Sequence, residues 1–128
     1  MPLIPQPAGS ARTVYPSAAR TATPTPDTHR SWRLERGGHF VIVVTAVTAT
    51  PSVVPTIEGY DATSDTWYPV LIGVAITATG TTVLKVYPGI AAATNACASD
   101  MLPQSWRVTM THADADSITY SVSANLVP

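Results

Sequence analysis

The chain has 128 residues and a formal net charge of −1, with 12% charged and 45% hydrophobic residues. This length allows one domain, and few charges with abundant Thr, Ala and Val favour β-strands over a helical bundle or a disordered chain. No segment approaches the ~20 apolar residues of a membrane-spanning helix, so we expect no membrane partner.

The first 36 residues differ in composition from the rest. They hold six of the twelve prolines and five of the seven basic residues, against only two carboxylates. Proline fixes φ and disfavours helix in the residue before it, so this composition predicts an extended arm over residues 1–36 that does not fold alone. Gly37 and Gly38 then predict a flexible joint, and residues 37–128 form the domain.

The basic residues of this arm predict a binding role. The predicted partner-binding residues are Arg12, Arg20, Arg30, Trp32, Arg33 and Arg36. Five cations spread over 36 residues would contact only a few phosphates of a nucleic acid, and aromatic residues are not interleaved with them in a pattern that would stack on bases. We therefore expect a protein surface that bears carboxylates, and not a nucleic acid, as the partner.

Strand signals follow the arm in close succession. Residues 39–49 are rich in β-branched side chains, and residues 53–60 and Thr66–Ile72 flank a polar turn, which predicts a hairpin. Residues 81–87 form the next predicted strand. For residues 90–100 we favour a loop over a short helical turn, because Gly89 and Pro103 bound the segment closely.

The clearest alternation comes last. Apolar residues occupy every second position in residues 106–111 and again in residues 118–126, with a turn over residues 112–116. This period of two predicts a terminal hairpin with one buried face. About six strands and no helix predict an all-β fold, an antiparallel β-sandwich of jelly-roll or Ig-like type with an extended N-terminal arm.

The sequence offers few groups for catalysis or metal binding. No recognised catalytic motif occurs, and a set of His112, Asp114 and Ser117 is also the ordinary content of a turn, so we predict no enzyme and no cofactor. Carboxylates spaced as Asp114 and Asp116, or as Asp61 and Asp65, are possible calcium ligands. Hairpin turns favour the same residues, and we therefore predict no metal site.

Trp67 and Tyr68 allow two interpretations. They form either a platform for stacking sugars, or a pair in which Trp67 packs in the sandwich and Tyr68 is half exposed; we favour the second. Trp106 is predicted to lie in the core. Cys97 is the only cysteine, which excludes an internal disulfide and fits a reducing cytosol, and the start of the chain has no pattern of a secretory signal.

From Gly38 onward the chain resembles small structural proteins of tailed bacteriophages. The resemblance lies in residues 44–51, 57–61, 67–68, 76–89, 102–103, 106–108 and 112–122. It is a pattern of strands and turns without a catalytic signature, and it does not include the arm.

This resemblance implies a β-sandwich virion component, a capsid decoration protein that stabilises the shell. The implied partner is the major capsid protein, and the implied assembly is a homo-oligomer, with a trimer favoured. On such a shell we expect the arm over residues 1–36 to lie extended across neighbouring capsid subunits and to clamp them. The implied location is the outer capsid surface of a virion assembled in the host cytoplasm. A head-tail connector or tail protein and a carbohydrate-binding adhesion module are the alternatives.

Overall fold

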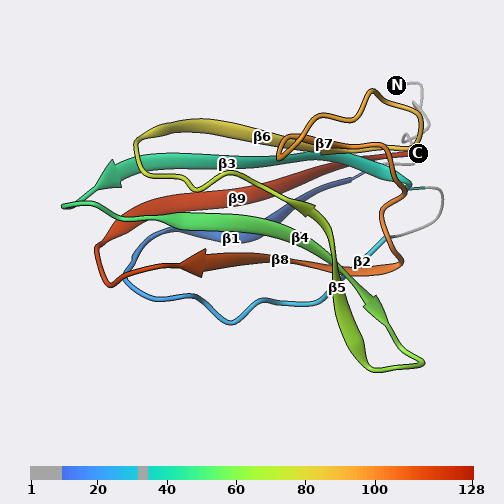
Figure 1. The fold of residues 1–128 in the computed structure, drawn as a ribbon, viewed down its shortest axis with the longest axis horizontal. Helices are drawn as coiled ribbons and strands as arrows, with labels where there is room; N and C mark the ends of the chain where they lie inside the picture. The colour runs from blue at the N-terminus through green and yellow to red at the C-terminus, as the bar shows by residue number, and fades with distance from the viewer. Residues whose placement is uncertain (1–9, 32–34) are drawn as a thin grey trace, which may run out of the picture.

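The computed structural model describes residues 10–31 and 35–128, and within them it shows two packed β-sheets and no helix (Figure 1). The all-β sandwich predicted from the sequence is confirmed. The strands are β1 (Ser10–Arg20), β2 (His29–Arg30), β3 (Gly37–Val47), β4 (Val53–Asp61), β5 (Thr66–Ile72), β6 (Gly80–Val86), β7 (Cys97–Ala98), β8 (Ser105–His112) and β9 (Ile118–Val127).

One sheet has the strand order β1-β9-β3-β6-β7, and the other has the order β2-β8-β4-β5. The named strands pair antiparallel, except for the short parallel pairing of β6 with β7. The five-stranded sheet therefore ends at β1 and β7, and the four-stranded sheet ends at β2 and β5. No helix in the described ranges is long and apolar enough to cross a membrane.

The core lies between the two sheets and follows the alternation of each strand. Phe40 and Ile42 of β3 are fully buried, as are Trp106 of β8 and Tyr120 and Val122 of β9. The Phe40 and Trp106 rings meet edge to face, with centroids 5.4 Å apart. The prediction of Trp106 as a core residue is thus confirmed, and burial of such aromatic groups is a main source of the stability of a small sandwich.

The predicted terminal hairpin is wrong. The strands β8 and β9 do alternate as expected, but β8 pairs with β2 and β4, whereas β9 pairs with β1 and β3. The connection between them therefore crosses from one sheet to the other. A period of two shows only that one face of a strand is buried. Two strands of a hairpin and two strands in opposite sheets both bury one face, so the period does not distinguish them.

The predicted arm and its boundary are also wrong for residues 10–20. These residues form β1, which pairs with β9 from Ser10 opposite Leu126 to Arg20 opposite Ile118. Val14 and Tyr15 of β1 are buried in the core. Pro16 is compatible with this strand because β1 lies at a sheet edge, and two irregularities in its register accommodate the extra residues. Residues 1–9 of the predicted arm lie outside the described residues.

Gly37 and Gly38 do not form a joint but begin β3. A Cβ atom on Gly38 would lie 2.0 Å from the carbonyl oxygen of Asn125, and one on Gly37 would lie 1.9 Å from that of Val86. Glycine is needed here because the neighbouring strands β9 and β6 approach closely.

The hairpin of β4 and β5 is confirmed, and in Figure 1 its turn projects beyond the two sheets at the lower right. The segment 90–100 is largely a loop, as predicted, although it contains the two-residue strand β7. Gly89, in the turn that follows β6, has a φ of 88°, which explains glycine at that position.

Candidate functional site

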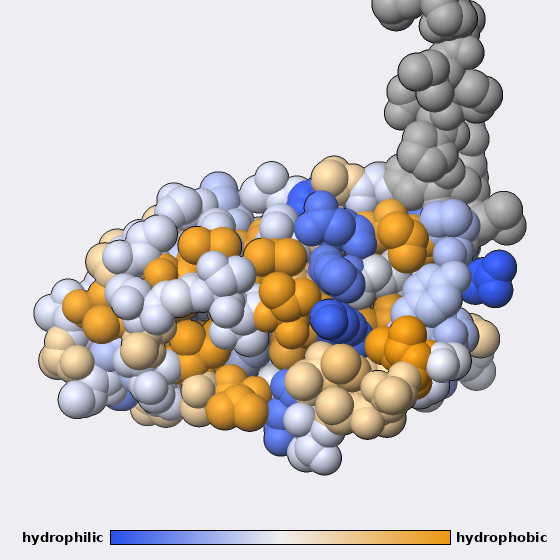
Figure 2. Space-filling view, turned by 90° about the horizontal axis from the view of Figure 1, so that it is seen from above, coloured by the Kyte–Doolittle hydropathy of each residue, from blue (hydrophilic) through white to orange (hydrophobic). Residues whose placement is uncertain are grey.

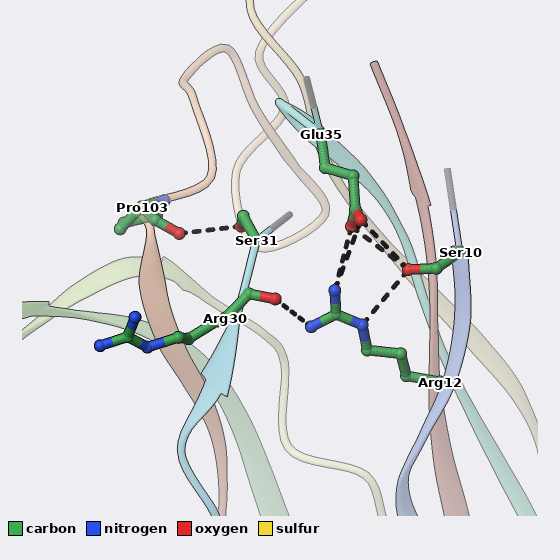
Figure 3. A network of polar contacts seen from close by, with 6 residues as sticks. All are labelled: Ser10, Arg12, Arg30, Ser31, Glu35 and Pro103. Carbon is green, nitrogen blue, oxygen red and sulfur yellow. Dashed lines mark hydrogen bonds and ion pairs between the residues drawn. The ribbon is translucent and has the colours of Figure 1, made fainter. Parts of the chain in front are cut away.

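Arg12 lies at the centre of a polar network that joins β1 to the chain around β2 and β3 (Figure 3). Its guanidinium lies 3.3 Å from a carboxylate oxygen of Glu35, whose side chain is only 5% exposed. Arg12 also donates hydrogen bonds to the Ser10 hydroxyl at 3.2 Å and to the backbone carbonyl of Arg30. Nearby, the Ser31 hydroxyl donates to the carbonyl of Pro103. The network holds the edge strand β1 onto the domain.

Arg20 is engaged within the domain as well. Its guanidinium donates to the backbone carbonyls of Tyr120 at 2.8 Å and of Pro16 at 2.6 Å. It also lies 4.5 Å from the centre of the Tyr120 ring and 5.5 Å from that of Tyr15, which are cation–π distances. Burial raises the pKa of both tyrosines to about 12.

The six predicted partner-binding residues therefore have different positions. Arg12 and Arg20 bind other parts of the same domain, whereas Arg30 and Arg36 are exposed. Trp32 and Arg33 lie outside the described residues. The positive charges expected on one free arm are thus divided between two arginines bound within the domain and two on its surface. A partner role for the exposed Arg30 and Arg36 stays a prediction.

A second group of functional side chains lies on the outer face of the four-stranded sheet. We call Glu58, Tyr60, Trp67 and Arg107 the outer cluster. The alternation of β4 and β8 directs these side chains away from the core, because Ile57, Gly59, Trp106 and Val108 between them are buried. The register places Glu58 opposite Arg107, and Tyr60 opposite Trp67.

The outer cluster is closely connected. Arg107 Nε donates to Glu58 Oε1 at 2.8 Å, and the Thr109 hydroxyl donates to the same oxygen at 2.5 Å. The Arg107 guanidinium lies 4.2 Å from the centre of the Trp67 ring. The rings of Tyr60 and Trp67 have centroids 4.9 Å apart and are tilted by 42°. Aromatic faces and charged groups from three strands thus form one surface.

The interpretation of Trp67 as a packed core residue is wrong. Trp67 is partly exposed and lies with Tyr60 on the outer face, whereas Tyr68 is exposed on the opposite side of β5. There Tyr68 covers Gly59, since a Cβ at Gly59 would lie 2.8 Å from the Tyr68 ring. The two aromatic residues do not form one platform, because adjacent residues of a strand point to opposite faces.

The third feature is an apolar surface where β5 meets the loop before β7. Ile72 and Val74 are 48% and 63% exposed. Ile72 lines a hollow of about 460 Å³ together with residues 69–71, 92–95 and 97–98, and Val74 follows two residues later in the chain. Figure 2, which views the molecule from the side of β6, shows apolar groups interspersed with weakly hydrophilic ones and a narrow band of strongly hydrophilic groups. We call Ile72, Val74 and the hollow the apolar border.

The remaining candidates are held in local hydrogen bonds. His112 Nε2 lies 3.0 Å from the Tyr120 hydroxyl, and Asp114 accepts from the backbone N–H of Asp116. Within the described ranges, no hydrogen bond joins His112, Asp114 and Ser117, and no group of three or more His, Cys, Asp or Glu side chains is placed to hold a metal. Cys97 is partly exposed and lines the hollow.

His29 stacks on Trp106, with ring centroids 4.7 Å apart and an interplanar angle of 19°. Within the described part of the chain, His29 Nε2 and Trp106 Nε1 are buried and have no hydrogen-bond partner. Burial, with a smaller contribution from Arg12, lowers the pKa of His29 below 6.5. The stack is therefore favoured while the imidazole is neutral.

Comparison of the chain with protein-family models, with curated proteins and with solved structures finds no match.

Glu58, Tyr60 and Arg107 were not singled out from the sequence. Their outward direction follows from alternation along each predicted strand. Their proximity depends on the pairing of β4 with β8, two strands that lie about fifty residues apart in the chain. Sequence periodicity carries no signal for that pairing.

Proposed function

We propose that the chain is a structural protein of a tailed-phage virion, which binds the outer surface of the capsid shell as a decoration protein. The observation that carries this proposal is the apolar border. Exposed aliphatic side chains beside a hollow are typical of surfaces that bind other proteins. The proposed partner, the major capsid protein, is the one implied by the resemblance of residues 38–128 to phage structural proteins.

The edges of the two sheets also support a role in assembly. The strand β5 ends the four-stranded sheet, and Ile72 at its end borders the hollow. An edge strand offers unpaired backbone groups to a neighbouring chain, and Pro69 limits this pairing to part of β5. We propose that the apolar border contacts the shell, with the exposed Arg30 and Arg36 paired to carboxylates of the capsid protein. A homo-oligomer, in the form of a trimer, completes the proposed arrangement.

Binding to shells tests this proposal. Shells assembled from the major capsid protein of the same phage are incubated with the purified chain and sedimented, and the bound copies per shell are counted. We expect saturable binding. Ile72→Asp and Val74→Asp each place a charge in the apolar border and should weaken binding at least tenfold, because a buried unpaired charge is costly.

Ser17→Asp is the matched control. Ser17 is exposed on β1, at the edge of the five-stranded sheet opposite β7. This variant should bind as the unchanged chain does. If the unchanged chain does not sediment with shells, the decoration role is wrong; if all three variants bind equally, the apolar border is not the contact. Binding only to the portal vertex or to tails would favour the connector or tail alternative.

A further inference from the structure

We propose that the outer cluster is a binding site for a neutral saccharide. This inference is independent of capsid binding, because it concerns the outer face of the four-stranded sheet and not the apolar border. It also differs from a platform of Trp67 and Tyr68, since the structure pairs Trp67 with Tyr60 instead.

The aromatic part of the outer cluster suits the apolar faces of a sugar ring. Trp67 and Tyr60 lie 4.9 Å apart and tilted, and both remain partly exposed. They lie side by side on the outer face of β4 and β5, and the Arg107 guanidinium covers part of the Trp67 ring. Aromatic side chains in such positions combine a large apolar contact area with little conformational freedom to lose on binding.

The charged part of the outer cluster retains hydrogen-bonding capacity. Arg107 uses Nε on Glu58, and among the described residues its two terminal nitrogens have no hydrogen-bond partner. Glu58 Oε1 accepts from Arg107 and Thr109, and in the same residues Oε2 has none. A guanidinium offers adjacent donors and a carboxylate offers adjacent acceptors, and this geometry suits the neighbouring hydroxyl groups of a sugar.

The charges of the outer cluster favour a neutral ligand. The positive charge of Arg107 is balanced by Glu58 at 2.8 Å. Asp65 accepts a hydrogen bond from the Tyr60 hydroxyl at 2.6 Å, and Asp61 lies in the same hairpin. Two additional carboxylates beside a balanced ion pair repel an anionic sugar and leave a neutral one unaffected.

The outer cluster is also held in place before any ligand arrives. Its side chains come from three paired strands, and Thr109 fixes the carboxylate of Glu58. The stacking of Arg107 on Trp67 fixes the guanidinium. A site built on strands holds its groups more precisely than a site on loops, and less entropy is lost on binding.

The test is an NMR titration of the full chain with cellohexaose, maltohexaose and mannohexaose, each to 10 mM, with a hyaluronan oligosaccharide as the anionic comparison. We expect saturable shifts of the Trp67 indole N–H and of β4 and β8 amides with at least one neutral oligosaccharide, and none with hyaluronan. Trp67→Ala and Glu58→Gln should each weaken this binding at least tenfold.

Tyr68→Ala is the matched control, because it removes an aromatic residue of the same strand on the opposite face; it should leave the affinity unchanged. Circular dichroism confirms that each variant is folded, and Trp67→Phe, which keeps a smaller platform, should retain part of the affinity. The absence of shifts with all three neutral oligosaccharides would overturn the proposal, as would binding that survives Trp67→Ala. Ile72→Asp should leave saccharide binding unchanged, so the two proposals can fail separately.

Discussion

Replacing Tyr15 tests whether β1 belongs to the domain. Tyr15 is only 6% exposed, and its hydroxyl donates to the Val108 carbonyl of β8 at 2.7 Å, across the two sheets. Its ring meets that of Tyr120 edge to face. Removing a buried aromatic side chain costs about 3–5 kcal/mol, so Tyr15→Ala should lower the free energy of unfolding by that amount.

Tyr15→Phe separates the hydrogen bond from the packing. This variant keeps the ring and leaves the Val108 carbonyl without its donor, which should cost about 1–2 kcal/mol. Urea denaturation followed by circular dichroism measures both changes, and each kcal/mol corresponds to about 3–5 °C in Tm for a chain of this length.

The control is Ser17→Ala, an exposed position on the same strand, which should change stability by less than about 0.5 kcal/mol. If Tyr15→Ala were as stable as the unchanged chain, residues 10–20 would not be part of the fold. The same reasoning predicts that residues 37–128 alone are markedly less stable than the full chain, because without β1 the strand β9 has no hydrogen-bonding neighbour on one side.

Three further predictions follow from single contacts. Gly38→Ala should cost about 3 kcal/mol, because its Cβ would meet the carbonyl oxygen of Asn125, and urea denaturation measures this. Arg12→Ala should cost about 3 kcal/mol, because it leaves the buried Glu35 carboxylate without its cation and, among the described residues, with only the Ser10 hydroxyl as a partner. Arg12→Met combined with Glu35→Leu should cost less, and an equal or larger loss in the double variant would refute this reasoning. The pKa of His29 is lower in the folded chain than in the unfolded chain, so on acidification the unfolded chain binds the proton at higher pH. The free energy of unfolding should therefore fall as the pH falls below about 6.5. His29→Phe, which keeps the stack on Trp106, should reduce that pH dependence, and an unchanged slope between pH 7 and pH 5 would contradict it.

The fold class and several strands could be predicted from the sequence, because alternation of apolar residues reports directly on burial. Residues 53–60 with Thr66–Ile72 were predicted as a hairpin, because the turn between them is short and polar. The pairing of β8 and β9 with different sheets could not be predicted, because both strands bury one face in either arrangement.

The strand β1 was missed because its composition is unusual for a strand. Proline and arginine in residues 10–20 favour an extended arm when no neighbour is known. The charges of Arg12 and Arg20 become compatible with a sheet only through Glu35 and through the Tyr15 and Tyr120 rings. Glu35 and Tyr120 come from other parts of the chain, so tertiary contacts decided the conformation of this segment.

A search for this chain on purified particles of tailed phages is the most direct test of the proposed function. Mass spectrometry and a cryo-EM reconstruction should find the chain in many copies on the outer shell, with Ile72 and Val74 against the major capsid protein. Absence of the chain from such particles, or its presence only at the portal or tail, would contradict the proposal that it is a capsid decoration protein.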